Sequence, residues 1–360
     1  MALTPGDLAP FFFAPSPNNP RYNISSVAGR YVVLAFLPPL ADPAAASALA
    51  AVAAARGLFD DSQRCLFGVL KTPEDFAAAR DDLPGLRWLH DLDGVVSGPL
   101  AMPEPGWVVL DPTLRVLLTA PLAAGPEVMR RLAALPSVDD HAETPLNAPV
   151  LIAPRVFEPA FCRRLIDYYE AAGGEPSGFM REIDGRTVVA MDPRHKKRSD
   201  AIIHDAPLRE QARLRIRRRL TPLIQRAFQF EATRMERYIV ACYDAGSGGY
   251  FRPHRDNTTK GTAHRKFAVS ISLDAEAHEG GDLRFPEFGG RTYRPPTGGA
   301  VVFSCSLLHE ATPVTAGKRY AFLPFLYDED GARLREANNA FLGEGVGEYR
   351  AGEPEPADQP

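Results

Sequence analysis

The sequence has no apolar run long enough to cross a membrane. Its longest run, at residues 31–41, contains Pro38 and Pro39 and is shorter than the about 18 residues that a membrane-spanning helix needs. The N-terminal residues carry no basic side chain ahead of their apolar run, whereas a secretory signal peptide has one. We therefore expect a cytoplasmic protein that does not contact a membrane.

Cysteine is scarce, with four residues in 360, and no two of them form a Cys-x-x-Cys pair. This pattern excludes a fold held together by disulfide bonds and a dithiol redox motif. It also provides no Cys-x-x-Cys pair that could supply two ligands of a zinc site. The four lie far apart in the chain, so we expect reduced and buried thiols at Cys65, Cys162, Cys242 and Cys305.

The sequence also lacks an excess of charge of either sign. Its 41 Lys and Arg residues and 45 Asp and Glu residues leave a net charge of −4, so the chain as a whole is not attracted to nucleic acid. Two basic runs, at residues 194–198 and 213–219, are interpreted as solvated faces. We expect no nucleic-acid partner.

A polar, proline-bounded segment at residues 137–149 predicts a linker between two domains. We therefore expect one domain at residues 1–136 and a second at residues 150–342. The remaining residues, 343–360, are rich in Gly, Pro and Glu and have no periodic apolar positions, which predicts a mobile tail.

The first domain alternates strand-like and helix-like segments. The segments at residues 30–36 and 107–119 each contain a short, continuously apolar Val-Val-Leu run, as expected for strands that helices cover on both faces. Residues 44–57 and 126–135 have helical character. The alternation predicts an α/β layer fold.

The second domain begins with helix-like segments at residues 157–173 and 207–228 and continues with strands. The strand-like segments are residues 236–243, 266–273, 281–285, 298–304 and 318–327. Helices followed by at least five strands predict a mainly β domain, a double-sheet jelly roll with flanking helices.

His254, Asp256 and His309 form the pattern with the clearest chemistry, and Arg319 follows ten residues after the last histidine. In an extended segment, residues i and i+2 point to the same side, so His254 and Asp256 can bind one ion. A histidine from a distant strand can complete one face of that ion. Two histidines and one carboxylate with open positions are typical of non-haem Fe(II) oxygenases.

A His-x-Asp or His-x-Glu pair alone is weak evidence, because eight histidines make a chance match roughly an even bet. His141 and Glu143 form such a match in the predicted linker. No strand surrounds that pair and no second histidine follows at a suitable spacing. We therefore assign no metal site to it.

Two segments resemble the prolyl 4-hydroxylase branch of the Fe(II)- and 2-oxoglutarate-dependent dioxygenases. They are VACYDAGSGGYFRPHRDN at residues 240–257 and SLLHEATPVTAGKRYAF at residues 306–322. The resemblance extends over about residues 149–339. It implies a double-stranded β-helix and a reaction that uses Fe(II), O2 and 2-oxoglutarate as cosubstrate and releases succinate and CO2.

By this resemblance, His254, Asp256 and His309 are the metal ligands and catalytic residues. Arg319 binds the distal carboxylate of 2-oxoglutarate, since a guanidinium is always charged and matches a carboxylate bidentately. Tyr243 reaches the cosubstrate through its hydroxyl group.

Oxygen-sensing members of the family use a further tyrosine on the following strand, where this chain has Ser270 or Ser272. The sequence therefore does not identify the second hydroxyl donor to 2-oxoglutarate. Lys318 precedes Arg319 and is expected to face the other side of its strand.

The resemblance favours hydroxylation of an aliphatic C–H over halogenation. In related halogenases a small residue replaces the acid and leaves a position for halide, whereas Asp256 leaves none. The expected substrate is a prolyl or other residue of a protein or peptide, or a free amino acid. Loops such as residues 179–200 and 257–265 would select it. A non-catalytic sensor of 2-oxoglutarate or iron is the alternative.

Residues 6–12, 27–38, 90–96 and 105–116 resemble a peroxiredoxin, a thioredoxin-like fold, across about the first 135 residues. That family carries a reactive cysteine in a turn after the first long strand, where this chain reads Ala-Asp-Pro-Ala-Ala at residues 41–45. Since the nucleophile is a thiolate, the resemblance predicts an inactive redoxin domain. Two alternatives are a docking module for a partner and a peroxidase that uses Cys65.

Overall fold

The computed structural model describes residues 3–102 and 104–352, which form two compact units. One unit comprises the described residues up to Ala148 together with the short segment Phe285–Arg291. The other comprises Pro149–Arg284 and the described residues from Thr292 onward. No helix in the described part of the chain is both long and apolar enough to cross a membrane.

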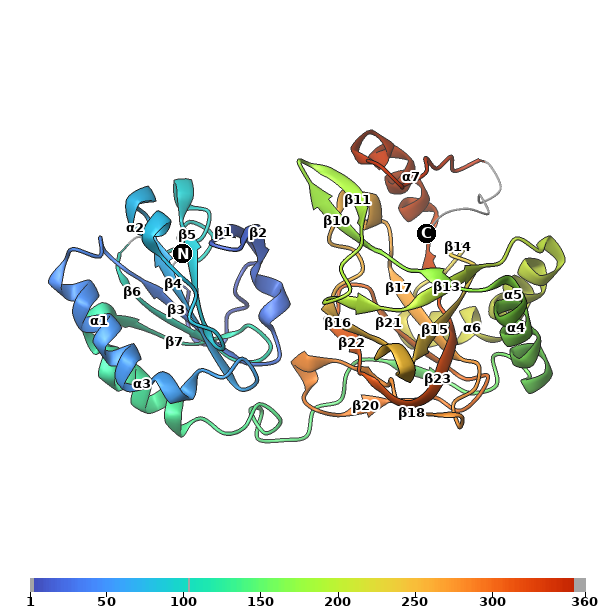
Figure 1. The fold of residues 1–360 in the computed structure, drawn as a ribbon, viewed down its shortest axis with the longest axis horizontal. Helices are drawn as coiled ribbons and strands as arrows, with labels where there is room; N and C mark the ends of the chain where they lie inside the picture. Colours follow the sequence, from blue (N-terminus) through green and yellow to red (C-terminus); the bar gives the residue numbers. More distant parts are fainter. Residues whose placement is uncertain (1–2, 103, 353–360) are drawn as a thin grey trace. The chain divides into compact units, whose positions relative to one another are not determined.

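The first unit is built on a five-stranded sheet (Figure 1). In order across the sheet, the strands are β5 (Leu86–His90), β4 (Arg64–Leu70), β3 (Tyr31–Phe36), β6 (Gly106–Leu110) and β7 (Val116–Pro121). The first three run parallel, whereas β6 and β7 pair antiparallel to their neighbours. A hairpin of β1 (Phe13–Ser16) and β2 (Asn19–Asn23) precedes them.

Helices cover this sheet because its central strands are apolar on both faces. Every residue of β3 and β6 is buried. The helices α1 (Pro43–Ala54) and α3 (Gly125–Ala134) lie together on one side of the sheet (Figure 1), and α2 (Pro73–Ala78) lies beside β5. The predicted α/β layers are therefore confirmed for this unit.

The apolar run at residues 107–119 forms two strands rather than the single strand that its composition predicted. After β6, the carboxylate of Asp111 accepts hydrogen bonds from the backbone N–H groups of Thr113 and Arg115, at 2.8 and 2.9 Å. Leu114 has a φ of 62°, which reverses the chain. A short acidic side chain that bonds its own backbone makes this turn despite the apolar neighbours.

The second unit is mainly β and is built on two larger sheets, with a separate two-stranded hairpin (Figure 1). The larger sheet consists of β14 (Arg234–Glu236), β24 (Phe325–Tyr327), β17 (Phe267–Ser272), β23 (Val314–Phe322), β15 (Ile239–Asp244), β13 (Ser199–Ile202) and β9 (Glu175–Pro176), joined by β18 (His278–Gly280), β21 (Ala300–Ser304) and β8 (Leu151–Ala153). The smaller sheet consists of β12 (Lys196–Lys197), β16 (Tyr250–His254), β22 (His309–Ala311), β19 (Leu283–Arg284) and β20 (Thr292–Tyr293).

The order of the core strands is that of a double-stranded β-helix. The strands β15, β17, β21 and β23 belong to the larger sheet, whereas β16, β19, β20 and β22 belong to the smaller one. The first strand of each set pairs with the last, β15 with β23 and β16 with β22. This arrangement confirms the jelly-roll prediction for the second unit.

Three helices cover one face of the larger sheet (Figure 1): α4 (Pro159–Ala172), α5 (Ala206–Arg219) and α6 (Thr221–Phe228). Leu165, Ile216 and Ile224 of these helices pack with Val240 and Phe322 of the sheet in one buried core. Because side chains alternate along a strand, the intervening sheet residues point the other way.

The segment predicted as one helix at residues 207–228 forms two helices, α5 and α6. The break lies at Leu220, two residues before Pro222, which has no backbone N–H to donate within a continuous helix. The hydroxyl of Thr221 donates instead to the carbonyl of Arg217 at 2.9 Å.

Residues 343–352 of the predicted mobile tail pack on the second unit. The side chain of Asn339 makes hydrogen bonds with both the N–H and the carbonyl of Tyr349, at 3.0 and 2.7 Å. The Tyr349 ring is 3% exposed and lies 4.2 Å from the guanidinium of Arg335, in α7 (Glu329–Ala337). These contacts depend on tertiary structure rather than composition. Residues 353–360 lie outside the described residues.

The backbone of this segment also bonds the hairpin formed by β10 (Phe179–Ile183) and β11 (Arg186–Ala190). The N–H of Gly343 donates to the carbonyl of Thr187 at 2.8 Å. A single aromatic side chain and a few backbone bonds therefore order a stretch that has no apolar periodicity.

We predict that Leu165→Ala will lower the free energy of unfolding of the second unit by about 2–5 kcal/mol, because it leaves a cavity between α4 and the sheet. Leu165 is fully buried. The matched control is Leu214→Ala on α5, where the side chain is 44% exposed and the expected loss is about 0.5 kcal/mol or less. Urea unfolding followed by circular dichroism measures both, and equal losses would contradict the packing described.

Candidate metal centre

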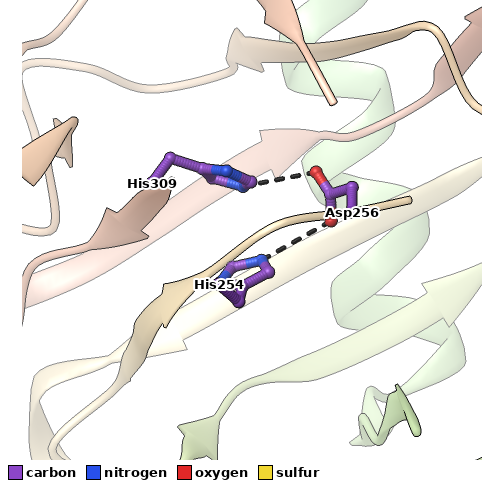
Figure 2. Close-up of side chains that lie close together, drawn as sticks. All are labelled: His254, Asp256 and His309. Atoms are coloured by element: carbon purple, nitrogen blue, oxygen red, sulfur yellow. Dashed lines mark ion pairs between the residues drawn. The ribbon is translucent and has the colours of Figure 1, made fainter. Parts of the chain in front are cut away.

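The side chains of His254, Asp256 and His309 converge at one end of the smaller sheet (Figure 2). His254 ends β16, His309 begins β22, and the two residues are paired in register. Asp256 lies between them, with its carboxylate oxygens 3.5 Å from Nε2 of His254 and 3.3 Å from Nε2 of His309. Three ligand atoms of the types that bind divalent metals thus face one point.

The other ring nitrogen of each histidine is held by the backbone. Nδ1 of His254 lies 2.8 Å from the carbonyl oxygen of Arg252, and Nδ1 of His309 lies 3.0 Å from that of Leu307. A carbonyl only accepts hydrogen bonds, so each Nδ1 carries a proton, and Nε2 of each ring faces the carboxylate of Asp256. A ring held in this way can coordinate a metal through Nε2.

The pKa shifts of His254 and Asp256 also fit a site for a cation. Burial, with a smaller effect of the neighbouring His309, lowers the pKa of His254 to about 4, so its ring is neutral near pH 7. Burial alone would raise the pKa of Asp256, but the two imidazoles hold it well below its usual value. Two imidazole Nε2 atoms and one carboxylate make a ligand set for a divalent cation.

Aromatic rings hold the two histidines in place. The ring of Phe251 stacks on His254, with 3.5 Å between centroids, and Phe303 lies 4.6 Å from His309. Phe251 is 8% exposed and Phe303 is 3% exposed, so water has little access to the site from these sides.

The triad opens into a cavity between the two sheets. Its wall is formed by Arg198, Arg237, Tyr243, Phe251, His254, Asp256, Ala268, Val269, Ser270, Leu283, Phe303, His309, Ala311, Arg319, Leu323, Pro324 and Phe325. The wall is largely apolar away from the metal ligands, the arginines and two hydroxyl groups.

Arg319 on β23 lies in this cavity with one nitrogen unsatisfied. Its NH2 group donates to the hydroxyl of Ser270 at 2.9 Å, and its guanidinium lies 4.8 Å from the ring centre of Tyr243. NH1 is buried without a hydrogen-bond partner, and no acidic side chain among the described residues forms an ion pair with Arg319. A buried guanidinium in this state is a receptor for a carboxylate.

Of the two serines left open by the sequence, Ser270 is the one that contacts Arg319 and lines the cavity. Lys318 points to the opposite face, where its ammonium lies 3.5 Å from Glu170 of α4. Tyr243 is 3% exposed and lines the cavity, and its hydroxyl accepts a hydrogen bond from Arg198 at 3.4 Å.

Sequence reasoning missed Arg198 and Arg237, which also line the cavity. The basic run at residues 194–198 was interpreted as a solvated face, and this is wrong for two of its members. Lys196 is 6% exposed and the Arg198 side chain is 4% exposed. The sequence did contain a sign that Arg198 is not simply solvated. Asp200 lies two positions after Arg198, and in an extended segment the two side chains point to the same side, where they can form an ion pair.

His141 and Glu143 are not part of any metal-binding group among the described residues. His141 lies in the segment that follows α3. Across residues 3–102 and 104–352, His254, Asp256 and His309 are the one group of three or more His, Cys, Asp or Glu side chains close enough to share an ion.

Comparison with known proteins agrees with this geometry. Residues 238–327 match the family model of the 2OG-Fe(II) oxygenase superfamily, and this range includes the triad and Arg319. A PKHD-type hydroxylase from Hyphomonas neptunium is 25% identical over 165 residues, which are 42% of this chain and 71% of that protein. A PKHD-type hydroxylase from Cupriavidus metallidurans is 31% identical over 32% of this chain and 56% of its own length.

Other relatives match over shorter ranges. The chain spans 39% of the length of a PKHD-type hydroxylase from Pseudomonas fluorescens, with 37% identity. Among solved structures, a Pseudomonas putida prolyl-4-hydroxylase has 20% sequence identity and a TM-score of 0.37, covering 54% of this chain and 98% of that one. These matches all concern part of the chain.

We predict that His309→Ala will abolish tight binding of Mn(II), used as a stable divalent probe. The loss should exceed the about 10–100-fold that removal of a supporting partner costs a metal site, because a ligand itself is removed. Equilibrium dialysis with electron paramagnetic resonance of free Mn(II) gives the affinity. His204→Ala, at an exposed position, is the control, and unchanged affinity in His309→Ala would contradict the site.

Proposed function

We propose that this 2OG-Fe(II) oxygenase domain hydroxylates an aliphatic C–H of an amino-acid or peptidyl substrate, with catalysis at His254, Asp256 and His309. The domain is an Fe(II)- and 2-oxoglutarate-dependent hydroxylase, similar to the PKHD-type and prolyl hydroxylases. The observation that carries the residue assignment is the convergence of two imidazole Nε2 atoms and one carboxylate on a single point, in a cavity that also contains the unpartnered NH1 of Arg319.

The ligand set covers one face of a metal ion. Nε2 of His254, Nε2 of His309 and the carboxylate of Asp256 would hold Fe(II) and leave its opposite face for other ligands. When bound, the iron and 2-oxoglutarate supply the O2 activation and C–H oxidation, in which 2-oxoglutarate is converted to succinate and CO2.

The residues around Arg319 would bind the cosubstrate. The guanidinium would pair with the distal carboxylate of 2-oxoglutarate through NH1, which is buried without a partner. The hydroxyl of Ser270, already bonded to NH2 of Arg319, would orient the group, and Tyr243 would contribute its hydroxyl from the neighbouring strand. The surrounding apolar wall would exclude water and strengthen this ion pair.

Asp256 favours hydroxylation over halogenation. Its two oxygens face both histidines, so it would occupy the coordination position that a halide needs. For the substrate, we propose a prolyl or other residue of a peptide or protein, or a free amino acid.

We predict that anaerobic addition of Fe(II) and 2-oxoglutarate to the apo-protein will produce the weak visible charge-transfer band of an iron–2-oxoglutarate chelate. His254→Ala should abolish the band. Arg319→Gln should retain it but require about 10–100-fold more 2-oxoglutarate, since a charge-assisted hydrogen bond contributes about 1.5–3 kcal/mol. Ser272→Ala, outside the cavity wall, should titrate as the native protein does.

The band, combined with a measurement of succinate release, also distinguishes an enzyme from a non-catalytic sensor. A hydroxylase slowly releases succinate when O2 is admitted to the complex, and a substrate accelerates this release. A band without any succinate formation would favour a sensor that binds both ligands without turnover. The absence of a band in the native protein would contradict the assignment of the site.

For the first unit, we propose an inactive redoxin-like domain at residues 1–136 that serves as a docking module for a partner of the oxygenase. The pairing within the five-stranded sheet supports the redoxin-like assignment. β3 with β4 and β4 with β5 are parallel pairs, whereas β3 with β6 and β6 with β7 are antiparallel pairs. Ala45, in the first turn of α1 after β3, is fully buried. A methyl group thus lies in the segment where the resemblance expects a reactive thiol.

The thiols of this chain are poor candidates for a peroxidase. All four cysteines are buried. Burial raises the pKa of Cys65 to about 12, so the thiol is protonated at neutral pH and lacks the nucleophilic thiolate.

We predict that the native protein at pH 8 will leave its four thiols unmodified by a disulfide reagent over minutes, and that all four will react in denaturant. Cys65→Ser, with three reactive thiols in denaturant, calibrates the count. Rapid modification of Cys65 in the native protein, together with peroxide consumption that Cys65→Ser abolishes, would instead support a peroxidase.

A further inference from the structure

The cavity beside the metal ligands contains more positive charge than the proposed chemistry uses. Three arginines line it: Arg198, Arg237 and Arg319. Arg319 is assigned above to the distal carboxylate of 2-oxoglutarate. Arg198 and Arg237 have no such assignment.

The backbone of Arg237 lies away from the positions of Tyr243 and Arg319. It precedes β15, which begins at Ile239, whereas Tyr243 lies near the far end of that strand and pairs in register with Arg319. The segment from Ile239 to Tyr243 spans ~13 Å at about 3.3 Å per residue. Arg237 therefore contributes to the cavity from the opposite end of β15, where its guanidinium lies 5.3 Å from the ring centre of Phe325.

The backbone at Arg237 has an uncommon conformation. Its φ is 68°, in the left-handed region that residues other than glycine seldom adopt. Such conformations persist where the surrounding structure requires them, and they cluster at ligand-binding sites. Here the turn between β14 and β15 directs the side chain into the cavity wall.

Arg198 and Arg237 share a single acidic partner. Oδ2 of Asp200 lies 2.6 Å from NH2 of Arg198 and 3.6 Å from NH2 of Arg237. Nε of each arginine is buried without a hydrogen-bond partner, and so is Oδ1 of Asp200. Burial, followed by repulsion from Arg198, lowers the pKa of Arg237 to about 10, so its surroundings do not balance its charge.

Lys196 also interacts electrostatically with Asp200, but burial, followed by repulsion from Arg198, lowers the pKa of Lys196 well below its usual value, which weakens its contribution to the positive charge here. Its ammonium donates to the hydroxyl of Ser177, at 2.7 Å, and to the carbonyl of Gly178. Its side chain is not part of the wall.

The charges in the complete site would leave one positive charge uncompensated. Three guanidinium groups face two carboxylates, those of Asp200 and Asp256. Fe(II) and the 2-oxoglutarate dianion cancel each other. A buried charge without a counterion is unfavourable, so a group with a single negative charge would complete the site, which fits a carboxylate better than a phosphate dianion.

We propose that Arg237, supported by Arg198, is an anion-binding subsite of the metal cavity and that the substrate carries a carboxylate that binds there. This carboxylate is either the chain terminus of an amino acid or peptide or an acidic side chain next to the oxidised residue. The inference rests on the proposed function, because the charge count includes Fe(II) and 2-oxoglutarate.

The experiment uses the full chain with Mn(II) and saturating 2-oxoglutarate, and measures paramagnetic relaxation of the acetyl protons of three probes. N-acetylglycinate represents a chain terminus, N-acetylglutamic acid α-amide represents an acidic side chain, and N-acetylglycinamide is the neutral control. We expect at least one acid to bind at least tenfold more tightly than the neutral amide, and the responding acid identifies the source of the carboxylate.

Substitutions test whether Arg237 binds the carboxylate. Arg237→Gln should remove the preference for the acid, Arg237→Lys should retain part of it because the charge remains, and Arg226→Gln, at an exposed position on α6, should have no effect. Equal binding of acid and amide, no binding of any probe, or an unchanged preference in Arg237→Gln would overturn the proposal.

The charge-transfer band of the iron–2-oxoglutarate chelate distinguishes a failure of the proposed subsite from a failure of the proposed function. If the band forms in both the native protein and Arg237→Gln but the probes show no preference, the subsite is wrong and the proposed function stands. If the native protein forms no band, both are contradicted.

Discussion

The antiparallel pairing of β16 with β22 is the constraint on which the metal centre depends. It places His254 opposite His309, and the two-residue repeat of an extended chain brings Asp256 to the same side as His254. Backbone carbonyls at Arg252 and Leu307 then fix both imidazole rings. A slip of one residue in this pairing would turn one histidine away from the other, so the fold specifies the ligand geometry.

The second requirement is a covered cavity on the inner face of the larger sheet. Alternation along β15, β17 and β23 separates residues that pack on the helices from residues that face the smaller sheet. Phe322 belongs to the helix-packed core, whereas Tyr243, Ser270 and Arg319 line the cavity. The same apolar environment that stabilises the domain therefore keeps the guanidinium of Arg319 away from water, which increases the strength with which it can bind a carboxylate.

Much of this arrangement could be predicted from the sequence because it follows from short-range regularities. The spacing of His254 and Asp256, with a histidine and then Arg319 on later strands, predicted which side chains would meet. The roles of Arg198 and Arg237 could not be predicted, because a cavity wall depends on which distant segments become neighbours. Arg198 lies in a basic run, and Arg237 is a single arginine in a strand-like segment, so neither position indicates by itself which cavity it lines.

Local side chain–backbone bonds explain the remaining differences. The turn at Asp111 divides a run that hydrophobicity alone predicts as one strand. The bonds between Asn339 and Tyr349 order a segment whose composition is typical of a mobile tail. In each case one polar side chain satisfies backbone groups, and this effect is not visible in a pattern of apolar residues.

The most direct test of the account is a crystal structure of the protein grown anaerobically with Fe(II) and 2-oxoglutarate, with anomalous diffraction recorded at the iron edge. The account predicts one strong iron peak bound by His254, Asp256 and His309, with the distal carboxylate of 2-oxoglutarate on Arg319. Iron bound elsewhere, or 2-oxoglutarate bound without contact to Arg319, would contradict it.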